Sequence, residues 1–166
     1  MLSALIILLI IIFDQISKQL AVLHLKDAEA VSFIPGLLSF RYHENSGAAW
    51  GILSEHRWVF MTVSSVAILA IVGFFIYCRI KNEKLSLLLI ISLSFFCGGG
   101  IGNMIDRFFL GYVVDFLRFD FINFPIFNVA DSFISIGACL MVLYLVIETV
   151  KEYQEKKHLK TDDNEL

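Results

Sequence analysis

Four long apolar stretches divide the chain. They cover about residues 2–23, 58–77, 85–105 and 126–147. Each is close to the roughly 20 residues that a helix needs to cross the hydrocarbon core of a bilayer. The pattern predicts an all-α membrane protein in which four transmembrane helices form one domain, residues 1–166. The first stretch has no basic segment before it and no small-residue cleavage site after it, so we interpret it as a retained helix.

The polar segments between these stretches differ in character. Residues 31–42 are rich in β-branched and aromatic residues and are interrupted by Pro35-Gly36, a turn signal, so they predict two short strands in a small β-rich region. Residues 106–125 carry many aromatic side chains, and we expect this loop to dip into the membrane interface. The tail at 154–166 is polar, and we expect it to fray as a disordered end.

Composition and charge support a multi-pass membrane protein. Hydrophobic residues make up 58% of the chain, charged residues only 17%, and the mean hydropathy is +0.77. Basic residues concentrate in 79–84 and in the tail after the fourth stretch. The positive-inside rule then puts both termini in the cytoplasm and the segments 24–57 and 106–125 outside. We expect no nucleic-acid partner.

The cysteines and histidines indicate no metal site. Cys78, Cys97 and Cys139 fall in or beside the apolar stretches without metal-ligand spacing. None of the four histidines belongs to an H-E-x-x-H or H-x-x-E-H pattern, which makes a membrane metalloprotease a poor interpretation. We therefore expect neither metal nor cofactor.

Polar residues interrupt the first and third stretches. Asp14 and Lys18 are four residues apart and share a helix face, so we expect an ion pair that orients the first helix. In GGGIGNMIDR (98–107), the spacing of Gly98 and Gly102 favours close helix packing. Asn103 lies in the same segment, where a buried amide needs partners. Asp106 and Arg107 follow it, and the simplest interpretation is that these two neutralise each other.

Two further carboxylates lie in short polar islands, Asp115 in VVDF (113–116) and Asp131 in FNVADS (127–132). A carboxylate near lipid is costly, so each needs a reason. For Asp131, stabilisation by a helix N-terminus is an alternative to a chemical role, although Asn128 is the better cap. All these polar groups fall at one depth, toward the outer ends of the spans, as a site at the outer interface requires.

Two carboxylates that share a proton can hydrolyse an amide bond. The ionised one takes a proton from water, and the protonated one stabilises the oxyanion and protonates the leaving amine. This chemistry needs neither a metal nor a covalent intermediate.

The chain closely resembles the bacterial lipoprotein signal peptidases, also called signal peptidase II. The blocks that carry the resemblance occur in the family's order and are DQISK (14–18), NSGAAWG (45–51), GGGIGNMIDR (98–107), VVDF (113–116) and FNVADS (127–132). The resemblance implies an aspartic endopeptidase of the bacterial inner membrane. Such enzymes cut the signal peptide from prolipoproteins just before a cysteine that already carries diacylglycerol.

The resemblance also implies roles for single residues. Asp115 and Asp131 match the catalytic dyad. The positions that line the site or hold substrate are matched by Asn45, Asn103, Arg107 and Asn128, and the supporting positions by Asp14, Lys18 and Gly99. Trp50 stands where phenylalanine is common, a small departure. The implied partners are a lipid-modified prolipoprotein, membrane lipid and cyclic peptide inhibitors such as globomycin, and we expect a monomer.

Two other functions fit part of the pattern. A proton-coupled transporter or channel subunit also places Asp and Arg inside a membrane, but it predicts polar residues that continue to the inner side. A membrane scaffold would use the same residues only to pack helices.

Overall fold

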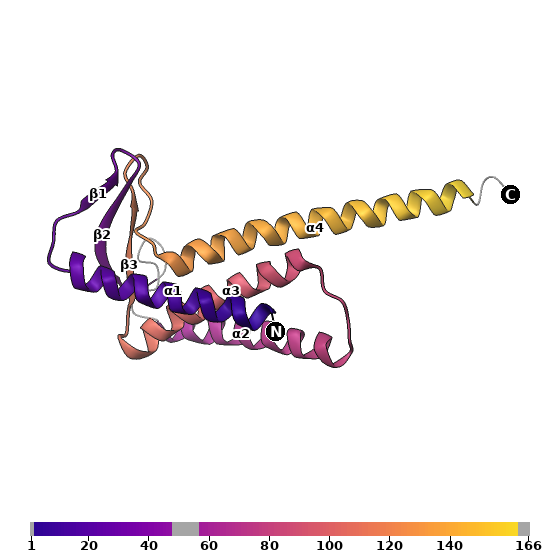
Figure 1. Ribbon diagram of the computed structural model, residues 1–166, viewed down its shortest axis with the longest axis horizontal. Helices are drawn as coiled ribbons and strands as arrows, with labels where there is room; N and C mark the ends of the chain where they lie inside the picture. Colours follow the sequence, from indigo (N-terminus) through magenta and orange to yellow (C-terminus); the bar gives the residue numbers. More distant parts are fainter. Residues whose placement is uncertain (1, 48–56, 163–166) are drawn as a thin grey trace.

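The computed structural model of the chain describes residues 2–47 and 57–162. In chain order its elements are α1 (Leu2–Leu25), β1 (Val31–Ile34), β2 (Leu38–Asn45), α2 (Arg57–Ile80), α3 (Leu87–Phe109), β3 (Val113–Phe119) and α4 (Val129–Asp162). The helices run along the long axis of the molecule, and the strands lie across one end of them (Figure 1).

Within the described residues, four helices are long and apolar enough to cross a membrane. The shortest, α3, has 23 residues and is about 35 Å long at 1.5 Å per residue. The hydrocarbon core of a bilayer is about 30 Å thick. The prediction of a four-helix membrane protein with a small β-rich region is therefore confirmed.

The helix bundle is polar inside and apolar outside. The buried residues include Asp14, Lys18 and Asn128, which are at most 2% exposed, whereas Phe13 on α1 is 57% exposed. A water-soluble domain has the opposite arrangement, because water solvates its charges and the apolar side chains avoid it. The outward apolar faces suit contact with lipid, and the interior supplies the hydrogen bonds that lipid cannot.

The third and fourth helices begin later than the hydropathy predicts. Helix α3 begins after Ser86, whose hydroxyl accepts a hydrogen bond from the Leu89 N–H at 3.1 Å as an N-cap. Helix α4 begins at Val129, because Phe127 is still extended and forms a bridge with Leu117 of β3. Hydropathy counts these apolar residues as part of a span although their backbone is not helical.

The structure describes the tail as helical as far as residue 162, whereas the sequence predicts a disordered end from about residue 154. Helix α4 continues to Asp162, has 34 residues and extends well beyond the other helices (Figure 1). Its last turns are rich in Glu, Lys and Gln, which are good helix formers. Lys151 pairs with Glu148 at 2.8 Å and Lys156 with Glu152 at 4.0 Å, and such pairs stabilise a helix by a few tenths of a kcal/mol each.

Small residues let α3 approach its neighbours closely, as the sequence predicts. A Cβ atom on Gly98 would lie 2.8 Å from the Cβ of Ile10 in α1. A Cβ atom on Gly99 would lie 2.5 Å from the carbonyl oxygen of Ala130 in α4. Neither position has room for a side chain, so α3 can pack against both helices only because these residues are glycines.

The sheet is antiparallel in the order β1-β2-β3. The predicted pair of strands is confirmed as β1 and β2, and their turn contains Gly36 at φ 73°. Strand β3 lies within residues 106–125, where the sequence predicts a loop, so the structure corrects that prediction. It pairs with β2 along Leu38–Asn45, and Val114 and Phe116 pack on Ala21 near the end of α1. Asp115 therefore lies in a strand and not in a loop.

Candidate active site

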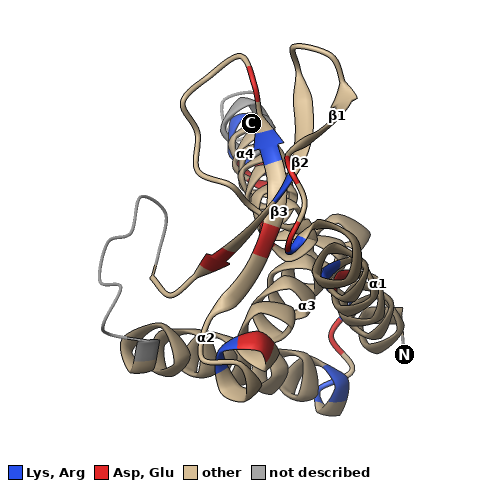
Figure 2. Ribbon diagram, turned by 90° about the vertical axis from the view of Figure 1, so that its left-hand side faces the viewer, with Lys and Arg blue, Asp and Glu red and all other residues tan. Residues whose placement is uncertain are grey.

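The candidate site lies where the sheet meets the helix bundle. Viewed from the sheet end, β3 passes in front of α3 (Figure 2), and it contacts both α1 and α3. Five elements contribute polar side chains here: α1, β2, α3, β3 and the start of α4. The nine predicted site residues are all described, and they are Asp14, Lys18, Asn45, Gly99, Asn103, Arg107, Asp115, Asn128 and Asp131. Trp50 lies outside the described residues.

The N-terminus of α4 is closed by a reciprocal pair of hydrogen bonds. The Asp131 N–H donates to Oδ1 of Asn128 at 2.9 Å, and the Asn128 N–H donates to Oδ2 of Asp131 at 3.2 Å. This is a capping box with Asn128 as N-cap and Asp131 three residues later. Asp14 of α1 adds a third contact by accepting the Ala130 N–H at 2.9 Å. Asn128 is thus the cap, as predicted, and Asp131 also has a structural role at this terminus.

Asp115 is buried under amide groups from two other elements. Its Oδ1 accepts a hydrogen bond from Nδ2 of Asn128 at 2.6 Å, and its Oδ2 accepts one from Nδ2 of Asn45 at 2.8 Å. Only 1% of the residue is exposed. Burial, and then the nearby charge of Asp131, raise the pKa of Asp115 to about 7 despite these two donors. Its carboxyl group can therefore gain or lose a proton near neutral pH.

Three asparagine side chains are held so that their NH₂ groups face the two carboxylates. The Oδ1 of Asn45 accepts the Gly47 N–H at 3.0 Å, and Oδ1 of Asn128 accepts the Asp131 N–H. Oδ1 of Asn103 accepts from Nζ of Lys18 at 2.9 Å, and its Nδ2 donates to Oδ1 of Asp131 at 2.7 Å. Because each amide oxygen is engaged by a donor, each nitrogen is left to point at an aspartate.

Lys18 holds three segments together from inside the bundle. Its ammonium group contacts Oδ2 of Asp14 at 2.9 Å, Oδ2 of Asp106 at 3.0 Å and Oδ1 of Asn103 at 2.9 Å. The ion pair between Asp14 and Lys18 is therefore confirmed. All three ammonium protons have acceptors, which a buried cation requires.

Asp106 has a different partner from the one expected. It pairs with Lys18, and its Oδ2 also accepts the Val114 N–H at 3.0 Å, one residue before Asp115. The expectation that Arg107 neutralises Asp106 is wrong, because consecutive helical residues point in different directions. Asp106 lies three residues after Asn103 on one helix face, and this spacing is the signal that could have identified it as a site residue.

Gln15 is a second residue that sequence reasoning missed. Its Nε2 lies 3.2 Å from Oδ2 of Asp14, 3.2 Å from the Gly102 carbonyl and 3.0 Å from Oδ1 of Asp106. It belongs to the DQISK block, and its place beside Asp14 is the available signal. These contacts join α1 to α3 beneath the two aspartates.

Arg107 faces away from this cluster toward an open cavity. Its Nη2 donates to the Gly47 carbonyl at 3.2 Å, and its guanidinium carbon lies 5.3 Å from the ring centre of Phe60. The buried Nε has no hydrogen-bond partner among the described residues. The guanidinium group can therefore donate a further hydrogen bond to a polar group that enters the cavity.

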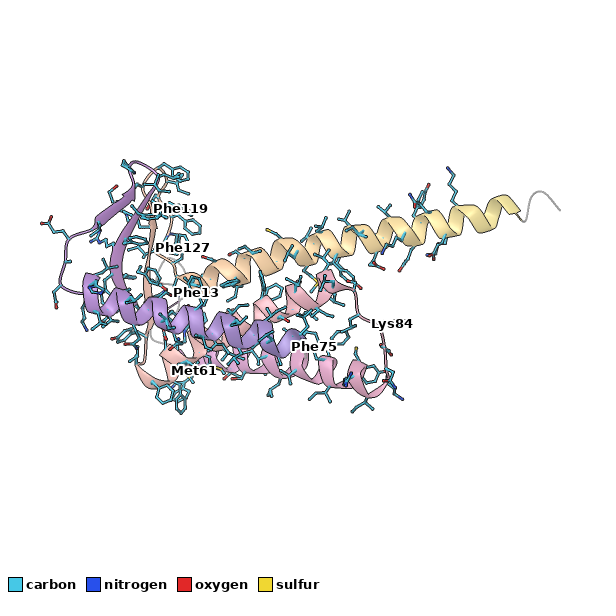
Figure 3. The ribbon with its side chains drawn as sticks, viewed as in Figure 1. Phe13, Met61, Phe75, Lys84, Phe119 and Phe127 are labelled. Carbon is cyan, nitrogen blue, oxygen red and sulfur yellow. The ribbon has the colours of Figure 1, made fainter. Side chains whose placement is uncertain are left out.

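The cavity has a volume of about 490 Å³ and combines a polar wall with an aromatic one. Asp131 lines it, whereas Asp115 is not among the lining residues but accepts a hydrogen bond from Asn45, which is one of them. Phe119 and Phe127, whose ring centres are 5.0 Å apart, stand on the sheet side facing α4 (Figure 3). The other lining residues include Phe60, Phe124, Ile136, Ser132 and Ser135. The cavity suits an amphiphilic molecule that presents a polar bond to Asp131.

Comparisons with known proteins identify relatives of this chain. A sequence-family model described as signal peptidase (SPase) II matches residues 6–147. The lipoprotein signal peptidase of Enterococcus faecalis (strain ATCC 700802 / V583) is 45% identical over 140 residues, which cover 84% of each chain. The lipoprotein signal peptidase of Streptococcus pyogenes serotype M5 (strain Manfredo) is 38% identical over 139 residues, which cover 84% of this chain and 89% of the relative.

Two solved bacterial membrane enzymes share the fold. One, determined by the in meso method at 2.3 Å resolution, has a TM-score of 0.79 and 36% identity, covering 89% of this chain and 88% of its own. The other, determined at 1.9 Å, has a TM-score of 0.75 and 36% identity, covering 86% and 91%. Since the family model spans most of the chain and the relatives are well above 30% identical, the protein belongs to the signal peptidase II family of peptidases.

Proposed function

We propose that the protein is an aspartic endopeptidase that removes the signal peptide from prolipoproteins. In this proposal it cuts just before a cysteine that carries diacylglycerol, and Asp115 and Asp131 are the catalytic dyad. The observation that carries the proposal is the link between the two carboxylates through Asn128, whose side chain binds one and whose backbone binds the other. Membership of the family and the names of the relatives support the substrate.

The two aspartates have different surroundings. Burial and the charge of Asp131 bring the pKa of Asp115 to about 7, so this carboxyl group readily keeps a proton. Asp131 lies in the first turn of α4, where the helix dipole and the Asn128 N–H favour the anion. Of the two carboxyl groups, only that of Asp131 lies at a helix N-terminus, so Asp131 is the better candidate for the anion. We assign the proton to Asp115 and the base to Asp131.

The reaction then needs only water. Asp131 takes a proton from a water molecule as the water oxygen attacks the peptide carbonyl, and Asp115 stabilises the oxyanion with its proton. When the carbon–nitrogen bond breaks, a proton passes from the dyad to the leaving amine. The products are a carboxylic acid and an amine, and the dyad again holds one shared proton.

The position of the site suits a substrate that stays in the bilayer. Its cavity lies at the sheet end of the helices, where Phe60, Phe124 and Ile136 supply apolar walls beside Arg107. A peptide anchored by a lipid could bring its scissile bond there without leaving the membrane. The positive-inside rule favours this end as the outer face, with both termini in the cytoplasm.

A proton-coupled transporter is not supported by the described residues. The charged residues buried among them, Asp14, Lys18, Asp106 and Asp115, all belong to the cluster at the sheet end. A proton path would need such groups to continue to the other end of the helices.

The test is cleavage of a synthetic diacylglyceryl-modified prolipoprotein peptide by the purified protein. Asp115→Asn and Asp131→Asn should each fold, as judged by thermal unfolding, and each should lose more than 99% of turnover, the roughly hundredfold or greater effect of removing a general acid or base. Near-normal turnover in either variant would sink the dyad assignment. Cleavage of the same peptide without its lipid, at equal rate, would sink the proposed substrate.

A further inference from the structure

A second large cavity lies at the end of the bundle opposite the sheet. Its volume is about 510 Å³, and it is bounded by the start of α1, the last turns of α2 and the start of α3. Figure 1 shows α2 and α3 spreading apart toward the segment that connects them, residues 81–86. The walls are largely apolar and include Ile7, Val72, Phe75 and Ile76. In a membrane, such a cleft between helices is open to lipid chains.

The segment that adjoins the mouth of this cleft is basic. Arg79 lines it, and Lys81 and Lys84 lie on the adjacent connecting segment, where Figure 3 labels Lys84. No ion pair involves these three side chains among the residues that the structure describes. Glu83 also lines the cleft, and its carboxylate lies 3.8 Å from the thiol sulfur of Cys78. Arg79 and Glu83 are thus the charged residues that line the cleft, and Lys81 and Lys84 give the adjoining segment a net positive charge.

We propose that this cleft binds one anionic phospholipid, with an acyl chain between α2 and α3 and the phosphate at Arg79. An apolar slot with cations at its mouth matches both parts of such a lipid, and basic pockets between transmembrane helices are known to bind anionic headgroups. A zwitterionic lipid fills the slot equally well but gains less from the cations. The bound lipid fills the space between α2 and α3 and stabilises the bundle.

The proposed lipid site is independent of the peptidase site. The two cavities share no lining residue, and they lie at opposite ends of the helices. Lipid binding here does not depend on the proposed reaction, and changes at the lipid site should leave peptide cleavage unchanged under detergent conditions.

Native mass spectrometry of the purified protein in detergent measures binding directly. With phosphatidylglycerol and phosphatidylcholine at equal concentration, the wild type should retain one phosphatidylglycerol preferentially and unfold at a higher temperature with it. Arg79→Gln should weaken phosphatidylglycerol binding about fivefold, the step expected for one basic residue at an anionic membrane surface. Lys156→Gln, on the exposed end of α4, removes a cation far from the cleft and should leave phosphatidylglycerol binding unchanged.

A second variant tests the slot and not the charge. Ala4 lines the cleft from α1, and Ala4→Trp should fill it and abolish the bound lipid while the fold is kept. Ile76→Trp does the same from α2 and serves if the first variant is unstable. Equal retention of the two lipids by the wild type, or unchanged phosphatidylglycerol binding in both Arg79→Gln and a folded slot variant, would overturn the proposal.

Discussion

The side-chain nitrogen Nδ2 of Asn128 lies 2.6 Å from Oδ1 of Asp115. This contact depends on how Asn128 caps the helix that follows it. Its Oδ1 is held by the Asp131 N–H at 2.9 Å, which leaves only the NH₂ group to face Asp115. One residue therefore caps α4, orients Asp131 and covers Asp115. The capping of the helix and the geometry of the dyad are parts of the same hydrogen-bond arrangement.

Substitution of Asn128 should separate these roles. Asn128→Ala removes the cap and the amide contact, so it should lower the unfolding free energy by about 1 kcal/mol and abolish most peptide cleavage. Asn128→Asp keeps a good cap but places a third carboxylate beside Asp115, so it should keep more of the stability and still lose cleavage. Thermal unfolding and turnover of the lipidated peptide measure the two effects.

Ser86→Ala is the matched control. Ser86 caps α3 at the far end of the bundle, and its loss should cost a similar free energy without changing turnover. If Ser86→Ala and Asn128→Ala lowered activity equally, the effect of Asn128 would be one of stability alone.

Pairing between segments far apart in the sequence explains which parts of the fold could not be predicted. The helices follow from local hydropathy, and Asp115 and Asp131 are conspicuous because their neighbours are apolar. Strand β3 could not be predicted in the same way, because its partner β2 lies some 70 residues earlier, as the contact between Asn45 and Asp115 shows. A strand that depends on a distant partner carries little local signal.

Long-range contacts also explain why some site residues are hard to predict from the sequence. Asp106 has an adjacent arginine, and this local explanation concealed its real partner, Lys18, which is on another helix. Asn103, in contrast, has no charged neighbour that could account for it, so it was recognised. Polar residues are therefore easiest to assign when the surrounding sequence offers them no partner.

Activity and stability should both depend on the protonation of Asp115. Its pKa is raised from 3.8 to about 7 in the folded protein, so above that pH the proposed acid is lost and turnover should fall. The folded protein also holds this proton more tightly than the unfolded chain. Stability should therefore be greatest below roughly pH 4 as far as this group is concerned, and fall as the pH rises through 7.

Asp115→Asn isolates this contribution. The variant cannot titrate at this position, so the slope of unfolding temperature against pH between roughly pH 4 and pH 7 should be smaller than in the wild type. The added NH₂ group also disrupts a hydrogen bond, which lowers the unfolding temperature at every pH. The slope against pH is therefore compared, and not the unfolding temperature itself. An identical slope in the two proteins would mean that Asp115 does not titrate in this range.

Lys18 should be needed because it neutralises two buried carboxylates. Lys18→Met leaves Asp14 and Asp106 without their cation, and breaking a buried pair in this way typically costs about 3–5 kcal/mol. Adding Asp106→Asn to Lys18→Met removes one of the stranded charges and should recover part of the unfolding temperature. If the double variant lost more unfolding free energy than the two single variants lose together, the charge argument would be wrong.

Chelators should leave peptide cleavage unchanged. All four oxygens of Asp115 and Asp131 accept hydrogen bonds from amide N–H groups, and such donors would repel a cation from the same oxygens. Turnover of the lipidated peptide should be equal with and without EDTA. Loss of activity in EDTA, with recovery on adding a divalent metal, would contradict a dyad that acts on water alone.

Gly99 should be needed for catalysis because it sets the distance between α3 and the start of α4. In Gly99→Ala the new methyl group would meet the Ala130 carbonyl at 2.5 Å and Cγ1 of Ile134 at 2.8 Å, so the helices must separate. Overpacking of this kind costs about 1–3 kcal/mol, and a shift of about 1 Å at Asp131 can reduce turnover about a hundredfold. Gly73→Ala on α2, with nothing within 4 Å of its added methyl group, should leave turnover intact and slightly stabilise the helix. Equal turnover in the two variants would show that α3 and α4 tolerate the wider spacing.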